Sequence, residues 1–180
     1  MRIEGILKTE KSEDMDTYWR FVEPLLESGF EKLEQMRIEE GKATRADIES
    51  ILEIIDLAIG EVKRNVSLIE HKIKERLKAR FYELLDGGVD ESRVYSETAV
   101  QLVRCDINEE LVRISTHLTT FKEVLDQPGA IGKKLDFICQ ELNREINTVG
   151  SKSMLREVDG AVVSIKDGLE KIREQLRNVE

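Results

Sequence analysis

The sequence has 180 residues, of which 36% are charged, 40% apolar and 5% aromatic, and its formal net charge is −9. With two prolines and few aromatic residues, this composition argues against a β-sandwich or barrel, and its apolar share argues against a disordered chain. An acidic chain is also not a uniformly basic nucleic-acid binder. No segment approaches the roughly 20 apolar residues of a membrane span, so we expect a cytoplasmic protein with no membrane partner.

The first predicted helix begins near Ser12, whose side chain suits an N-cap. Its apolar residues, among them Trp19 and Leu33, recur at helical spacing. Pro24 lies inside this segment and should kink the helix or split it in two. Gly41 should close it.

The strongest helical periodicity runs from Ile48 to Leu84, where apolar residues alternate mostly by four and three. This spacing is typical of a coiled-coil seam, on one helix of roughly 40 residues and about 60 Å. A stripe of that length cannot be buried against one small body. We therefore expect an arm that pairs with another helix, in the same chain or in a second subunit, and that ends at Gly87-Gly88.

Four shorter helices should follow. The first starts at Asp90 or Ser92, and Asp106 is the predicted N-cap of the second, with Glu109 completing an acidic capping box. Pro128-Gly129 should separate this helix from the next, over 131–149, and Gly150-Ser151 should precede the last, over 154–178.

The predicted fold is therefore all-α, with a long antiparallel or coiled-coil-like helical arm plus a small helical bundle. Its expected parts are an N-terminal helical segment over residues 1–44, the arm over 45–96, and a C-terminal helical domain over 97–180. Cys105 and Cys139 are far apart, and we expect both to be reduced and partly buried.

No nucleotide-binding, zinc-protease or hydrolase motif is present, so the candidate chemistry lies in polar stripes on helices. Asp106, Glu110, Arg113 and His117 follow one another at i, i+4, i+7 and i+11, which places them on one helix face. Together such groups can hold a divalent ion, grip a phosphate and move a proton. The alternative is a ladder of ion pairs that faces water.

A second stripe repeats this spacing with Asp136, Gln140, Asn143 and Asn147. Asparagine is a mediocre helix former, so an amide row suits recognition, because amides both donate and accept hydrogen bonds. The alternative is that these amides satisfy loops and helix ends inside an interface. Nearby, Glu141 and Glu145 form an i, i+4 carboxylate pair able to ligate Mg²⁺ or Mn²⁺.

Residues 63–80 carry seven basic and two acidic residues, a local charge of +5 in a chain of −9. This uneven distribution is compatible with a surface that follows nucleic-acid phosphates. The alternative is the solvated face of a coiled coil.

Two blocks of the sequence resemble a known family. GKKLDF at 132–137, continued by QELNREINTVGSK at 140–152, is similar to the signature of the YicC/YloC family of bacterial proteins, and DINEELVRISTHLTTF at 106–121 resembles the block before it. This resemblance implies a cytoplasmic, metal-dependent endoribonuclease that uses Mn²⁺ or Mg²⁺, cleaves RNA, and assembles as a homo-oligomer, a hexamer in the family.

Chemistry then suggests a role for each residue in the matching blocks. The candidate metal carboxylates are Glu109, Glu110, Glu141 and Glu145, with Asp106 and Asp136 as second choices. His117 would transfer a proton. The candidate phosphate contacts are Arg113, Lys134, Arg144 and Lys152, and the candidate contacts to ribose or base edges are Gln140, Asn143 and Asn147.

The family usually begins with an N-terminal half that opens in a Ser-Met-Thr-Gly-Phe-Gly type motif, and this sequence has no such motif. We therefore expect the chain to correspond to the C-terminal part of the family's pattern. Two alternatives to an active nuclease follow, a non-catalytic RNA-binding or oligomerisation module and a purely structural oligomerisation body.

Overall fold

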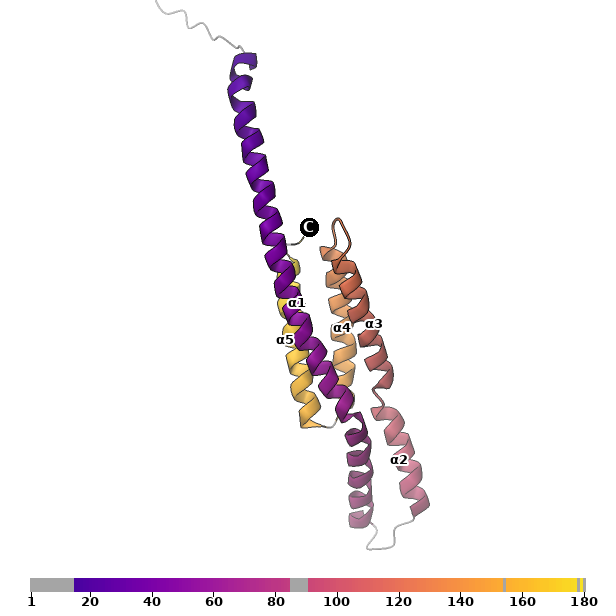
Figure 1. Cartoon of the computed structure of the whole chain (residues 1–180). Coiled ribbons are helices and arrows are strands. Elements are labelled where there is room, and N and C mark those ends of the chain that lie inside the picture. The colour runs from indigo at the N-terminus through magenta and orange to yellow at the C-terminus, as the bar shows by residue number, and fades with distance from the viewer. Residues whose placement is uncertain (1–14, 85–90, 154, 178, 180) are drawn as a thin grey trace, which may run out of the picture. The chain divides into compact units, whose positions relative to one another are not determined.

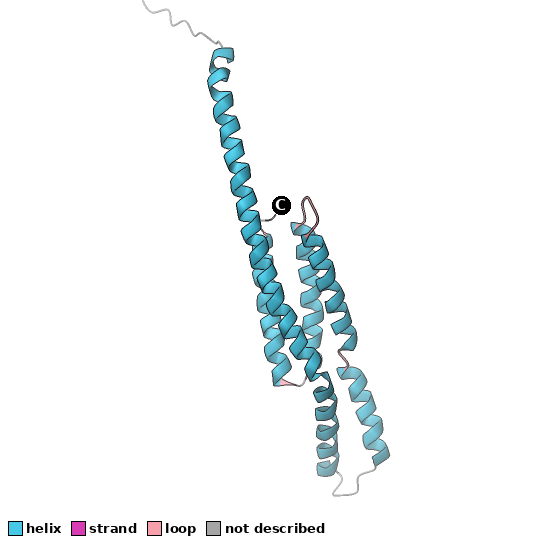
Figure 2. Cartoon of the chain, in the orientation of Figure 1, coloured by secondary structure: helices cyan, strands magenta, loops and turns pink. Residues whose placement is uncertain are grey.

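The computed structural model describes residues 15–84, 91–153, 155–177 and 179, and this part of the chain is helical with no strand. Figures 1 and 2 show its helices. In chain order they are α1 (Met15–Leu84), α2 (Glu91–Cys105), α3 (Asn108–Leu125), α4 (Gly132–Lys152) and α5 (Arg156–Leu176). The predicted all-α class is confirmed. No helix in the described ranges combines the length and apolarity needed to cross a membrane.

The chain divides into two compact units, Met1–Ala43 and Thr44–Glu180. In the described part of the first unit, α1 passes through Pro24 without ending, so the predicted split there is wrong. The predicted end at Gly41 is also wrong. A glycine inside a helix costs about 1 kcal/mol, and the helix-forming residues around Gly41 outweigh that cost.

The second unit is built around an antiparallel arrangement of α3, α4 and α5, in which α4 packs against both neighbours. Figure 1 shows these three helices side by side, joined by short connections. Their buried apolar residues repeat by three and four, as the sequence predicts: Ile114, Leu118, Phe121, Leu135, Leu142, Ile146, Val158, Ile165, Leu169 and Ile172. This packing fixes how polar residues on α3 and α4 face one another.

The part of α1 inside the second unit buries its apolar stripe against the same core. Ile48, Leu52, Ile55, Ile59, Val62 and Ile73 are buried, and Val66 and Leu77 are partly buried. Polar contacts also join α1 to α3, since Lys122 Nζ lies 2.6 Å from Asp56 Oδ2 and Lys63 Nζ donates to Ser115 Oγ at 3.1 Å. Much of the stripe is therefore covered within one chain, while the coiled-coil geometry of the arm stays a prediction.

Several predicted helix boundaries differ from the structure. The break at Gly150-Ser151 is wrong, because α4 continues to Lys152 and Gly150 instead lets α5 approach closely; a Cβ there would lie 3.2 Å from Val162 Cγ1. The break at Pro128-Gly129 is confirmed, with Gly129 at a φ of +95°. The predicted signals at Ser12, Gly87-Gly88, Asp90, Met154 and Asn178 lie outside the described residues.

The start of α3 also differs in detail from the predicted capping box. Ile107 occupies the N-cap position and no side chain caps it, so the capping box is wrong. Asp106 acts one residue earlier, where its Oδ1 accepts hydrogen bonds from the backbone N–H and the side-chain amide of Asn108 at 2.9 and 2.8 Å. The acidic residue still satisfies a free N–H at the helix start.

Both cysteines are free and buried. Burial raises the pKa of the Cys139 thiol to about 12, so this thiol stays protonated at neutral pH. Only the thiolate form of cysteine acts as a nucleophile or a metal ligand. Because the Cys139 thiol stays protonated, its role is to pack in the core.

Candidate functional site

The antiparallel pairing of α3 and α4 brings the N-terminal half of α3 against the C-terminal half of α4. Arg113 of α3 meets Glu145 of α4, with Nε 3.2 Å from Oε2. Towards the start of α3, Lys152 Nζ lies 2.9 Å from Glu110 Oε1 and also donates to the Asp106 carbonyl oxygen at 2.8 Å. The first polar stripe therefore meets Glu145 of the predicted carboxylate pair and Lys152 across one helix pair, and the amide row takes no part in these contacts.

Five charged side chains form what we call the α3–α4 ion cluster: Glu109, Glu110, Arg113, Glu145 and Lys152. Arg113 is its centre, because its Nη2 atom also lies 3.3 Å from Glu109 Oε1 and 3.7 Å from Glu110 Oε1. The cluster joins residues expected to bind metal with residues expected to bind phosphate.

Two carboxylates of the cluster are buried, since Glu110 is 4% exposed and Glu145 is 8% exposed. A buried charge is costly unless a counter-charge and hydrogen bonds compensate it. Glu110 Oε1 meets Lys152, but within the described residues Glu110 Oε2 is buried with no hydrogen-bond partner. The incomplete satisfaction of this carboxylate is typical of a functional site rather than of a helix-stabilising ion pair.

The cluster has three carboxylates and two cations, which leaves one negative charge in excess. No group of three or more His, Cys, Asp or Glu side chains within the described ranges is placed to hold a metal ion. Mg²⁺, however, commonly takes one or two carboxylates from a protein and completes its shell with water and substrate phosphates. The residues present fit a divalent ion held in that way and do not fit an all-protein metal centre.

Asp136, a second-choice metal ligand, lies outside the cluster. Its Oδ1 accepts a hydrogen bond from Arg173 Nε of α5 at 2.9 Å, and its Oδ2 accepts one from Gln140 Nε2 at 2.7 Å. The Arg173 hydrogen bond, followed by that of Gln140, holds the pKa of the Asp136 carboxyl below its usual value. Asp136 thus ties α4 to α5, and Arg173 is a partner that sequence reasoning missed.

Replacing Asp136 by Asn should lower the free energy of unfolding by about 0.5 kcal/mol at pH 7, a small effect because water screens a pair of half-exposed groups. The Asp136 pKa is lower in the folded chain, so the stabilisation is fully present above the unfolded value near 3.8 and is lost as the pH falls from there through the lower folded pKa. Urea titrations of both proteins at pH 7 and pH 3 measure this change. The control is Asp167→Asn, which removes a more exposed pair within α5; a gap between wild type and Asp136→Asn that is as large at pH 3 as at pH 7 would contradict the ionic origin.

The remaining predicted site residues lie along the two helices beyond the cluster. His117, Glu141 and Asn143 are half-buried, while Arg144 and Asn147 are exposed. Lys134 is exposed and donates to Gln127 Oε1 at 3.0 Å. His117 is one turn beyond Arg113, and Glu141 is one turn before Glu145, so the antiparallel register places His117 and Glu141 at the same level of the pair.

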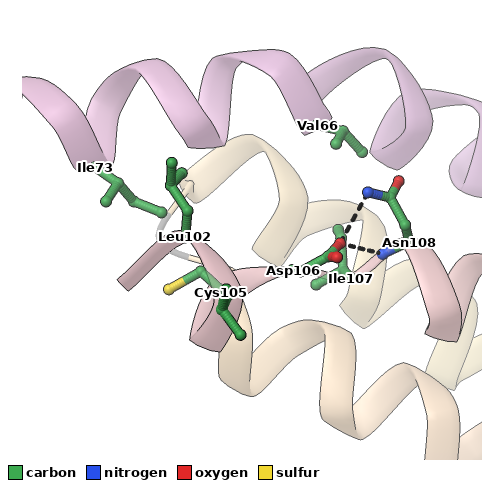
Figure 3. Close-up of a pocket in the computed structure, with 8 residues that line it drawn as sticks. Val66, Ile73, Leu102, Cys105, Asp106, Ile107 and Asn108 are labelled. Atoms are coloured by element: carbon green, nitrogen blue, oxygen red, sulfur yellow. Dashed lines mark hydrogen bonds between the residues drawn. The ribbon is translucent and has the colours of Figure 1, made fainter. Parts of the chain in front are cut away.

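A cavity of about 200 Å³ lies near the cluster, between α1 and the junction of α2 with α3. Figure 3 shows the Asp106 carboxylate turned towards Asn108 at one end of it. Among the described residues its lining is mainly apolar and includes no cationic side chain: Val66, Ile73, Leu102, Val103, Cys105, Asp106, Ile107 and Asn108. A phosphate has no counter-charge there, so the ion cluster is the better candidate for phosphate chemistry.

The basic residues predicted to follow phosphates are exposed on α1. They are Lys63, Arg64, His71, Lys72, Lys74, Arg76, Lys78 and Arg80. At the start of this run, Lys63 donates a hydrogen bond to Ser115 of α3. A polyanion has access to this surface.

Known proteins similar to this chain point to one family. The chain is 39% identical over 173 residues to the probable endoribonuclease YicC of Clostridioides difficile (strain 630), a match that covers 95% of this chain and 59% of the relative. It is 36% identical over 145 residues to the probable endoribonuclease YicC of Haemophilus influenzae (strain ATCC 51907 / DSM 11121 / KW20 / Rd), covering 81% of this chain and 50% of the relative. The chain thus spans about half to three fifths of the length of these relatives.

A family model described as the C-terminal domain of YicC-like endoribonucleases matches residues 62–180. This range contains α2 to α5, the end of α1 and the whole ion cluster. It covers well over half of the chain and confirms the resemblance read from the sequence. The chain therefore belongs to the family of YicC-like endoribonucleases, through the C-terminal domain of that family.

Proposed function

We propose that this chain acts in the cytoplasm on RNA, and that it cleaves phosphodiester bonds at the α3–α4 ion cluster. Family membership and the names of both relatives support the activity. The observation that carries the location is the buried Glu110 carboxylate, which has one oxygen without a partner in the described residues and lies beside two cations.

Each side chain of the cluster has a part in this proposal. Arg113 and Lys152 supply the positive charge that orients a phosphate and stabilises the charge that develops on it. Arg113 lies between Glu110 and His117 on α3, so a phosphate on Arg113 has a carboxylate on one side and an imidazole on the other. Glu110 would accept a proton from the attacking water, and His117 would give one to the departing oxygen.

A divalent cation, Mn²⁺ or Mg²⁺, belongs to this proposal. Glu110 and Glu145 are the residues that would hold it, with Glu109 at the exposed edge and Glu141 one turn away on α4. When bound, such an ion lowers the pKa of a coordinated water and neutralises phosphate charge. The excess negative charge of the cluster favours its binding.

The exposed basic residues of α1 favour a second candidate function, RNA binding without cleavage. Seven exposed cations over residues 63–80 can track a phosphate backbone without any catalytic group. This function needs no ion cluster, and its affinity falls steeply with salt.

Assembly into a homo-oligomer is also part of the proposal. In the first unit, large apolar side chains of α1 are exposed, among them Val22, Leu26 and Phe30, which recur at i, i+4 and i+8 and so share one helix face. Contiguous exposed apolar surface of this kind is typical of an interface between proteins. Light scattering coupled to size-exclusion chromatography measures the mass, and a monomer at micromolar concentration would refute this part.

Cleavage of end-labelled single-stranded RNA by the purified chain tests the main proposal. We expect fragments with Mn²⁺ or Mg²⁺ and their loss with EDTA. Cleavage that survives EDTA would remove the metal from the proposal and keep the nuclease. A salt titration of RNA binding by the same protein separates the second candidate, which predicts salt-sensitive binding and intact RNA under every condition.

A further inference from the structure

The solvent face of α4 carries an aromatic side chain that the core does not use. Phe137 is 61% exposed, whereas Leu135 and Ile138 on either side of it are buried. The apolar face of α4 that contains Leu135 and Ile138 is therefore packed in the core, and Phe137 lies outside that face. A ring that is mostly exposed contributes little burial of apolar surface to the fold.

Cationic and amide side chains surround this ring along α4. Lys133, Gln140 and Arg144 lie at i−4, i+3 and i+7 from Phe137, so all share its face, and all are exposed. Within the described residues, Lys133 and Arg144 form no ion pair. Two carboxylates lie close in the helix: Glu141 shares the face of Phe137 at i+4, and Asp136, next to Phe137 in the chain, is already held by Arg173. With Lys133 and Arg144 against Glu141, the net charge around the ring is still positive.

We infer that Phe137 is a stacking platform for an unpaired base of single-stranded RNA. This inference rests on the proposed function and adds a binding residue to it. Bases of any identity stack on aromatic rings, and proteins that bind single strands combine such rings with cations that contact the backbone. The rise of α4 puts Lys133 about 6 Å and Arg144 about 10 Å along the helix from Phe137, so these cations reach phosphates on both sides of a stacked base.

The composition of this face favours a nucleic acid over a second copy of the chain. Lysine is depleted in the centre of protein–protein interfaces, where aromatic and apolar residues gather. Along α4, the positions that share the face of Phe137 at i−4, i−3, i+3, i+4 and i+7 hold two lysines, an amide, a glutamate and an arginine, and none of these five is apolar. The amide of Gln140 can donate to and accept from a base edge, which suits the same ligand.

Fluorescence anisotropy with a labelled 12-nucleotide single-stranded RNA tests this inference, using the full chain in EDTA so that binding is measured without cleavage. We expect Phe137→Ala to weaken binding about tenfold and Phe137→Trp to retain wild-type affinity. Phe137→Leu should behave like Phe137→Ala, because leucine keeps the apolar area and lacks the ring. The control Val163→Ala removes an exposed apolar side chain of α5 and should leave the affinity unchanged.

A 2-aminopurine base in the RNA reports stacking directly, since the wild type should quench its fluorescence and Phe137→Leu should not. Equal affinity of wild type and Phe137→Leu would overturn the inference. A second result would also overturn it. If Phe137→Ala changes the mass measured by light scattering, and the variant binds RNA normally when compared with wild type in the same oligomeric state, Phe137 contacts another copy of the chain. Wild type that binds and stacks RNA but never cleaves it would refute the proposed nuclease and leave Phe137 in its role, whereas wild type that binds no RNA would refute both.

Discussion

Replacing Glu110 by Gln should reduce the rate of RNA cleavage by about 100-fold or more, while the chain keeps its fold. Glutamine has nearly the volume of glutamate, but it cannot accept a proton at the reaction pH, and its neutral carbonyl oxygen binds a divalent ion more weakly than a carboxylate does. Lys152 is 30% exposed in its side chain and keeps its hydrogen bond to the Asp106 carbonyl oxygen, so it is not left as a buried unpaired charge. We therefore expect the free energy of unfolding to change by less than about 2 kcal/mol.

Single-turnover cleavage of labelled RNA measures this effect, with circular dichroism and urea unfolding on the same samples. The control Glu123→Gln makes the same substitution at an exposed position of α3 outside the cluster and should cleave like wild type. If Glu110→Gln cleaves at the wild-type rate, Glu110 is a structural ion-pair partner and the reaction centre lies elsewhere. If it binds RNA with unchanged affinity and fails to cleave it, the loss belongs to the chemical step.

Apolar periodicity predicted the helices and their core faces well, because a residue's place on a helix follows from spacing alone. Ile114, Leu118 and Phe121 illustrate this, since they recur at spacings of four and three, which predicts one core face, and each is buried. Helix ends were predicted less well, because glycine has two structural uses. Gly41 and Gly150 both read as stop signals, yet α1 passes through the first and the second provides space for Val162.

The candidate site was predicted in pieces. The spacing placed Glu110 and Arg113 on one face of a helix, but their contacts with Glu145 and Lys152 depend on the register between α3 and α4. That register is set by core packing and by the turn at Pro128-Gly129. The spacing of residues within one helix gives no information on how that helix aligns with its neighbour. The same limit applies to Arg173, whose pairing with Asp136 joins helices that the periodicity treats separately.

Replacing Gly168 by Leu should destabilise the second unit by about 2–3 kcal/mol and lower its melting temperature by about 5–10 °C. A Cβ at Gly168 on α5 would lie 3.0 Å from Ile55 Cγ1, 3.1 Å from Ile55 Cδ1 and 3.2 Å from Ile51 Cγ2, both on α1. Leucine adds further atoms beyond that Cβ, so α1 and α5 must move apart or the isoleucines must leave their preferred rotamers. Its better helix propensity offsets only about 1 kcal/mol of this strain.

Gly160→Ala is the matched control on the same helix. Nothing lies within 4 Å of a Cβ at Gly160, so alanine should raise stability by about 0.5–1 kcal/mol through helix propensity alone. Combining Gly168→Leu with Ile55→Ala should cost less than the sum of the two single changes, since the leucine can fill the space that isoleucine leaves. If α1 covers α5 within one chain, Gly168→Leu should lower the melting temperature by the same amount at every protein concentration, whether or not the chain assembles. A loss that changes clearly with concentration would assign the Ile51 and Ile55 stripe to a contact between subunits, which is the alternative that apolar periodicity alone leaves open.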